Sequence, residues 1–165
     1  MNATHPARWI RFLNVSVEFT ATGIGAQITN NGTANPQHIF WDQGHVAGSL
    51  RGFDISGGIG IGIMNSTFVS NQQEGVKISS SAPQDVDISH NPFDSNGTVA
   101  ANTYDHINLA AGLSRFQITN NYFNSEFGGA RQRYAVTVNA GPSSQYVIGS
   151  NVCGDADMGA GCIND

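Results

Sequence analysis

A repeated segment is the feature of this sequence that most limits its fold. Four stretches align without gaps, and they are IMNSTFVSN from Ile63, ISHNPFDSN from Ile88, ITNNYFNSE from Ile118 and IGSNVCGDA from Ile148. Each stretch begins with Ile, and five residues later it carries Phe68, Phe93, Phe123 or Cys153. The stretches follow one another at 25, 30 and 30 residues, which is a period typical of solenoid proteins.

Two short strands are expected in every repeat, because bulky residues recur at a spacing of two. The first strand carries the pairs Ile61/Ile63, Val86/Ile88, Phe116/Ile118 and Tyr146/Ile148. The second carries the pairs Phe53/Ile55, Val76/Ile78, Ile107/Leu109 and Val136/Val138. A short strand with one apolar face is buried only when equivalent strands stack on it, about 4.8 Å apart. We therefore predict an all-β fold, a right-handed single-stranded parallel β-helix, with an antiparallel sandwich as the alternative.

The predicted register brings unlike charges together in three columns that were not used to define it. The outward column of the second strand holds Asp54, Lys77, Asn108 and Thr137. A second column holds Asp85, Arg115 and Gln145, and a third holds Arg51, Glu74, Asp105 and Tyr134. Unlike charges on neighbouring strands stabilise a sheet, so the columns favour this register.

The length of 165 residues suits one domain over residues 1–165, with less regular coils in 1–50 and clear repeats in 51–165. The registers of RFLNVSVEF, GAQITNNGT and IFWDQGHV are left open, although each is expected to hold strands. Asn-rich turns, including Asn30, Asn31, Asn120 and Asn121, suit stacked amide ladders or left-handed turn residues.

The charge and composition exclude several classes of function. A net charge of −5 with scattered basic residues argues against nucleic acid as a partner. The longest apolar stretch, Gly58 to Met64, is too short to cross a bilayer, and no signal peptide is recognised at the N-terminus. Cys153 and Cys162 are too few for a disulfide framework, so Cys153 is expected as a buried thiol, with a local bridge to Cys162 as the alternative. Asp155 and Asp157 form only a weak calcium-type pattern, and we predict no metal and no cofactor.

The coils VDISHNPFDSNG and FQITNNYFNS and the C-terminal QYVIGSNVCGDADMGAGCIND resemble β-helical phage tailspike and tail-fibre proteins of the pectate-lyase-like superfamily. The resemblance covers roughly residues 55–165. It implies a homotrimeric virion protein of a tail or surface appendage, made in the host cytoplasm, that binds or cleaves host surface polysaccharide. Polygalacturonase-type members carry an NTD…DD…GHG…RIK set, of which this chain has only Gly44-His45, and the calcium-binding carboxylates of pectate lyases are not recognisable.

Two insertions between the strands of adjacent coils define a candidate ligand-binding face. They span Asp94 to His106 and Asn124 to Tyr134. Aromatic rings beside planar hydrogen-bonding groups suit sugar recognition, and the candidates are Asp94, Tyr104, Asp105, His106, Glu126, Arg131, Arg133 and Tyr134. The alternative is a solvated loop face whose charges pair locally.

Glycoside cleavage requires two carboxyl groups about 5 to 9.5 Å apart. Glu74 and Asp105, one coil apart in the same column, are the candidate catalytic pair, and Asp94 with Glu126 is a second pair. The alternative for Glu74 is an ion-pair ladder with Arg51. Trp41, in a cluster with Asp42 and His45, is expected to be buried.

The expected function is a tailspike-like virion module that binds host polysaccharide. A polysaccharide lyase or glycoside hydrolase of the same fold is the second candidate, and a structural fibre or decoration protein is the third. Exposed strand edges at both ends of a β-helix favour a homotrimer. Its contact surface is expected to hold small uncharged residues, namely Ser79, Ser80, Ala110, Ala111, Asn139 and Ala140.

Overall fold

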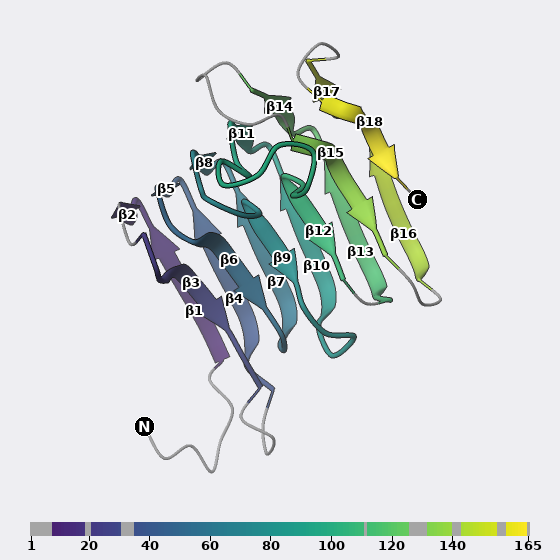
Figure 1. Ribbon diagram of the computed structural model, residues 1–165. Coiled ribbons are helices and arrows are strands. Elements are labelled where there is room, and N and C mark those ends of the chain that lie inside the picture. Colours follow the sequence, from purple (N-terminus) through teal and green to yellow (C-terminus); the bar gives the residue numbers. More distant parts are fainter. Residues whose placement is uncertain are drawn as a thin grey trace.

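The protein folds into a parallel β-solenoid. The computed structural model describes residues 8–18, 21–30, 35–110, 112–125, 132–139, 143–154 and 158–164. Regular structure in these ranges is β throughout and forms three parallel six-stranded sheets, here called sheets A, B and C. The chain visits A, B and C in rotation, so that each coil adds one strand to every sheet (Figure 1). This arrangement confirms the predicted parallel β-helix and excludes the antiparallel sandwich.

The three sheets differ in strand length. Sheet A has the long strands β1 (Arg8–Leu13), β4 (Gln37–Asp42), β7 (Ile59–Met64), β10 (Gln84–Ser89), β13 (Ser114–Thr119) and β16 (Ser144–Gly149). Sheet B has the short strands β2 (Ser16–Glu18), β5 (His45–Ala47), β8 (Thr67–Val69), β11 (Pro92–Asp94), β14 (Tyr122–Asn124) and β17 (Val152–Cys153). Sheet C consists of β3 (Ile24–Ile28), β6 (Arg51–Ile55), β9 (Val76–Ile78), β12 (Ile107–Leu109), β15 (Gln132–Val138) and β18 (Met158–Asn164).

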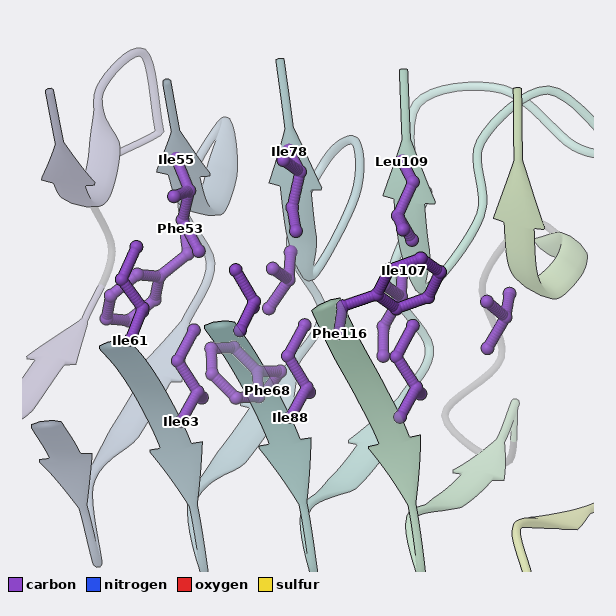
Figure 2. Close-up of a cluster of buried hydrophobic side chains, with 14 of the residues drawn as sticks. Phe53, Ile55, Ile61, Ile63, Phe68, Ile78, Ile88, Ile107, Leu109 and Phe116 are labelled. Atoms are coloured by element: carbon purple, nitrogen blue, oxygen red, sulfur yellow. The ribbon is translucent and has the colours of Figure 1, made fainter. Parts of the chain in front are cut away.

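The core is built from the columns that the repeat predicts. In sheet A, Ile63, Ile88, Ile118 and Ile148 are paired in register on successive strands. In sheet B, the corresponding column is Phe68, Phe93, Phe123 and Cys153. The side chains of both columns meet those of sheet C inside the solenoid (Figure 2). The last members, Ile148 and Cys153, are only half-buried, because β16 and β17 are the final strands of their sheets in the described chain.

The first coils follow the same three-sheet pattern, although their sequences repeat less clearly. Trp41 pairs with Ile63 and therefore occupies the Ile column, and Val46 pairs with Phe68 in the Phe column. Trp41 is buried against Phe53, with ring centroids 5.0 Å apart. The prediction that Trp41 packs inside a coil is confirmed.

Amide side chains form a ladder along the turn between sheets A and B. The Nδ2 atom of Asn91 donates to Oδ1 of Asn121 at 3.1 Å, and Asn121 donates in the same way to Asn151 at 3.1 Å. Each amide also donates to a backbone carbonyl of the coil before it. Asn120 has a positive φ of 56° in the same turn. Both predicted roles of the Asn-rich turns are therefore observed there, whereas Asn31 lies outside the described residues.

A disulfide closes the last coil. Cys153 of β17 is bonded to Cys162 of β18, with their Cα atoms 6.0 Å apart. The expected buried thiol at Cys153 is therefore wrong, and the alternative of a local bridge is correct. The physical reason is that the two cysteines lie on adjoining sheets and both face the interior.

Candidate functional site

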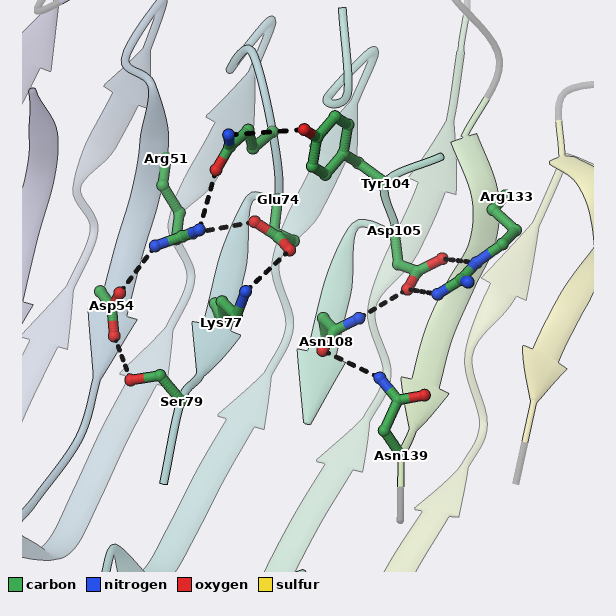
Figure 3. A network of polar contacts seen from close by, with 11 residues as sticks. Arg51, Asp54, Glu74, Lys77, Ser79, Tyr104, Asp105, Asn108, Arg133 and Asn139 are labelled. Atoms are coloured by element: carbon green, nitrogen blue, oxygen red, sulfur yellow. Dashed lines mark hydrogen bonds and ion pairs between the residues drawn. The ribbon is translucent and has the colours of Figure 1, made fainter. Parts of the chain in front are cut away.

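The outer face of sheet C carries a network of ion pairs and hydrogen bonds (Figure 3). Arg51 Nε donates to Glu74 Oε2 at 2.8 Å, and Arg51 also binds Asp54 at 2.7 Å. Lys77 Nζ lies 3.5 Å from Glu74 Oε1. Glu74 is buried, so both carboxylate oxygens face cations in a partly desolvated setting. The ladder proposed between Arg51 and Glu74 is confirmed.

Asp105 is enclosed in the same way on the next coil. The Arg133 guanidinium donates to both of its carboxylate oxygens, at 3.1 and 2.7 Å. Asn108 Nδ2 donates to Oδ2 at 2.8 Å, and the Tyr134 backbone N–H donates to Oδ1 at 3.1 Å. Asp105 is fully buried beneath these partners. Four hydrogen bonds therefore occupy the acceptor sites of this carboxylate, which is the pattern of a group that anchors an insertion to the sheet.

These contacts bear on the candidate pair of Glu74 and Asp105. A general acid has to deliver a proton to a ligand, so it needs a path to the surface. The structure surrounds both carboxylates with side chains of this chain. Catalysis by this pair stays a prediction that the contacts do not favour. In the other proposed pair, Glu126 lies outside the described residues.

The insertion residues are distributed between the surface and the interior. Tyr104 and Tyr134 are half-buried, and Gln73 Nε2 donates to the Tyr104 hydroxyl at 3.5 Å. Asp94 accepts a hydrogen bond from Ser95 Oγ at 2.7 Å. The insertion folds back over the preceding coil, where the Gly97 N–H donates to the Asn71 carbonyl at 2.8 Å. Glu126 and Arg131 lie outside the described residues, so only part of the expected face is placed.

His106 lies inside the solenoid. Its ring is fully buried between those of Phe93 and Phe123, with centroid distances of 6.0 and 5.6 Å. The Asn96 amide lies 3.0 Å from Nδ1, which makes Nδ1 the acceptor of the neutral ring. Burial lowers the pKa of His106 to about 3, against an opposing effect of the Asn124 backbone carbonyl. His106 is therefore a neutral core residue and does not present its ring to a surface ligand.

The described structure has two pockets on the outer face of sheet A, a surface that the sequence did not single out. The first, here called the aromatic pocket, has a volume of about 380 Å³ and is lined by Trp9, Ile10, Arg11, Phe40, Asp42 and Met64. Trp9 is 72% exposed and stacks on His38, with ring centroids 4.2 Å apart. The pKa of Asp42 is lowered by hydrogen bonds from Asn65 and Arg11. An exposed indole therefore lies beside a fixed ion pair.

The second pocket, here called the polar pocket, has a volume of about 330 Å³. It is lined by Asp85, Val86, Asp87, Arg115, Phe116, Gln117, Gln145 and Val147. Arg115 donates to both oxygens of Asp85, at 2.5 and 3.0 Å, which confirms the predicted pairing in this column. The Arg115 guanidinium lowers the pKa of Asp85, so this carboxylate stays ionised near neutral pH. Exposed amides and a fixed ion pair suit hydrogen bonding to hydroxyl groups.

A residue with positive φ recurs at the same position in every strand of sheet A. One residue in each sheet A strand has a positive φ between 52° and 70°, namely Trp9, His38, Gly60, Asp85, Arg115 and Gln145. These residues lie at equivalent positions on neighbouring strands, and the strand register is the same on both sides of them. Asp85 and Asp87 line the same pocket, as expected for residues two apart on a strand whose intervening residue, Val86, faces the core. The charged column of Asp85 and Arg115 is a signal for this site in the sequence, whereas Trp9 and Phe40 fall in coils of unassigned register.

No protein-family model, curated protein or solved structure matches this chain. No membrane-spanning helix is found among the described residues. Those residues also contain no group of three or more His, Cys, Asp or Glu side chains arranged to hold a metal ion. Functional assignment therefore depends on the geometry of the solenoid surface.

Proposed function

We propose that this protein is a β-solenoid module that binds polysaccharide through the outer face of sheet A. The observation that carries the proposal is the aromatic pocket, where an exposed indole lies beside an ion pair on a rigid sheet. Sugar rings have apolar faces that stack on aromatic rings, and their hydroxyls bond to planar polar groups. A surface built on stacked strands also loses little conformational entropy when a ligand binds.

The biological setting that we propose is a phage tailspike or tail fibre that recognises host surface polysaccharide. Its support is the resemblance of the coils between residues 55 and 165 to such proteins, together with the parallel solenoid. A fold alone does not define a function, so the proposal depends on binding measurements. Location in a virion and trimeric assembly belong to the same proposal.

The test is binding to an immobilised array of bacterial capsular polysaccharides and lipopolysaccharide O-chains. Trp9→Ala should weaken binding about tenfold, because it removes the stacking contact with the sugar ring. A tenfold loss of affinity corresponds to about 1.4 kcal/mol. Tyr122→Ala is the matched control, since Tyr122 is an exposed aromatic residue, at 46%, on sheet B. Both variants should keep the thermal midpoint of the wild type within a few degrees.

Other outcomes would favour a different binding site or a different function. Weaker binding in Tyr104→Ala with unchanged binding in Trp9→Ala would move the site to the insertion face. Release of reducing ends from the bound polymer would favour a polysaccharide hydrolase, and release of unsaturated ends would favour a lyase. A wild-type protein that binds no polysaccharide on the array would favour a structural fibre or decoration protein.

A further inference from the structure

Lys77 and Asn108 lie side by side on the outer face of sheet C (Figure 3). They are paired in register on the parallel strands β9 and β12, which belong to consecutive coils. Parallel strands run about 4.8 Å apart, and the four methylene groups of a lysine side chain can span that distance. Lys77 is also the only lysine in the sequence. An amine and a side-chain amide therefore occupy neighbouring outward positions of the sheet.

The amide of Asn108 is held by a hydrogen bond at each end. Its Nδ2 atom donates to Asp105 Oδ2 at 2.8 Å, and its Oδ1 atom accepts from Asn139 Nδ2 at 3.2 Å. A donor on a carbonyl oxygen stabilises the negative charge that develops when a nucleophile attacks the carbonyl carbon. A carboxylate at the amide nitrogen can pass a proton to it, as a leaving group requires. Asn108 is therefore bound in the way that acyl transfer from its side chain needs.

The Lys77 amine lies beside a carboxylate that can take its proton. Nζ is 3.5 Å from Glu74 Oε1, and the side chains of Lys77 and Glu74 are 25% and 5% exposed. An amine attacks a carbonyl only in its neutral form, so it needs a nearby base. The contacts that close Glu74 and Asp105 to an external ligand do not hinder this chemistry, because both reacting groups belong to the same chain.

We propose that Lys77 and Asn108 form an intramolecular isopeptide bond, with Glu74 and Asp105 as the catalytic carboxylates. The bond joins β9 to β12 and encloses the insertion between Asp94 and His106 in a covalent loop. It holds together two coils whose connection is interrupted by this insertion. The proposal goes beyond polysaccharide binding and does not depend on it.

The reaction conserves atoms and charge. Glu74 takes a proton from the Lys77 ammonium group, and the Nζ lone pair then attacks Cγ of Asn108. The Asn139 amide donates to the resulting oxyanion. Asp105 takes a second proton from Nζ and passes it to Nδ2, so that the Cγ–Nδ2 bond breaks and ammonia leaves. Ammonia takes the proton held by Glu74 and departs as ammonium, which leaves a secondary amide and two ionised carboxylates.

The bond is tested by the mass of the intact, denatured protein. The wild type should be lighter than its sequence by one molecule of ammonia. Lys77→Arg should have the full mass, because a guanidinium keeps the positive charge beside Glu74 but stays protonated and does not attack. Asn108→Ala should also have the full mass. The matched control is Asn65→Ala, which removes an exposed asparagine after β7 and should keep the deficit.

Proteolysis gives an independent readout, because the sequence has a single lysine. A lysine-specific protease should cut denatured Asn108→Ala once, after Lys77, and should leave the wild type uncut. Digestion of the wild type before its aspartate residues should release one branched peptide that joins β9 to β12.

A wild type of full mass that the lysine-specific protease cuts would overturn the isopeptide bond. A deficit that persists in Lys77→Arg would also overturn it, because an asparagine can lose ammonia by closing a succinimide with the next backbone nitrogen. Glu74→Gln should form the bond more slowly, since it removes the proton acceptor. If this variant folds poorly, the comparison with Lys77→Arg still decides, because that variant keeps the cation beside Glu74.

Discussion

The role of a residue in this solenoid depends on whether its side chain points into the core or towards the outer side. His106 and Asp105 are neighbours in sequence, yet one ring lies among the core aromatics and the other side chain holds the Arg133 guanidinium on the outer side. Both are fully buried, and their chemistry differs because their surroundings differ. A sequence pattern that grouped them in one loop face could not separate these roles.

The buried His106 makes stability depend on pH. Its pKa is lowered from the ordinary 6.5 to about 3 in the folded protein, so the unfolded chain binds a proton more readily. The stabilising effect of the neutral ring is complete above pH 6.5 and is lost as the pH falls towards 3, at up to about 1.4 kcal/mol per pH unit. The free energy of unfolding should therefore fall between pH 7 and pH 4 in urea titrations.

A variant without the titrating ring isolates this effect. His106→Gln is neutral at every pH, so its stability should decline less steeply over the same interval, although it is lower at pH 7. Parallel pH profiles for wild type and variant would assign the acid sensitivity to other groups.

Among the strands, the sequence predicted those whose hydrophobic core positions repeat from one coil to the next. The Ile and Phe columns follow directly from the alignment, because each coil must present a bulky residue to the same interior position. The first coils were not assigned, since Trp41 and Val46 fill these slots with different residues. The aromatic pocket was missed for the same reason, because Trp9 and Phe40 lie in these unassigned coils.

The disulfide takes over a packing role in the last coil. In earlier coils, the interior contact between sheets B and C is made by the rings of Phe93, His106 and Phe123. In the last coil, the small side chains Cys153 and Cys162 occupy the corresponding places and are joined covalently. The bridge thereby holds the short strand β17 to β18 where ring packing ends.

Reduction of this bridge should loosen the C-terminal coil selectively. A local disulfide of this kind stabilises by about 2 to 4 kcal/mol, and β17 has only two residues to hold it by hydrogen bonds. Hydrogen exchange followed by mass spectrometry should show faster exchange in β17 and β18 with dithiothreitol, while β7 and β10 stay protected. The Cys153→Ser/Cys162→Ser double variant should resemble the reduced protein and not respond to dithiothreitol. Uniform exchange changes along the chain would contradict a local role.

In the whole molecule, large exposed apolar side chains are concentrated at the two ends of the solenoid. Within the described chain, most of the large exposed hydrophobic side chains belong to the first and last coils, namely Trp9, Phe12, Leu13, Tyr146, Val147, Val152 and Ile163. Phe12 and Tyr146 occupy the interior columns of sheet A and are covered from one side only, where Phe12 packs against Trp41 with tilted rings and Tyr146 stacks on Phe116. Coils in the middle are covered on both sides, so the ends are where the solenoid differs most from a closed domain.

The last prediction concerns assembly into a homotrimer, which remains a proposal. Three parallel solenoids about one axis would bury lateral faces beside sheet C and leave the pockets of sheet A directed outward. Of the small residues expected at the contact, Ser79 and Ala110 are exposed, whereas Ser80 and Asn139 are half-buried and Ala111 and Ala140 lie outside the described residues. Light scattering at micromolar concentration should give three times the 17.4 kDa of one chain.

Charge placed on the proposed contact should dissociate such a trimer. Ser79→Arg and Ala110→Arg introduce like charges at equivalent positions of all three subunits, which costs binding energy because arginines would be desolvated without partners. Ala101→Arg, at an exposed position of the insertion after β11, adds the same charge elsewhere and should leave the mass unchanged. A wild-type protein that stays at the mass of one chain would refute the trimer and weaken the tailspike proposal. Polysaccharide binding through sheet A could still hold, because both pockets are formed within a single chain.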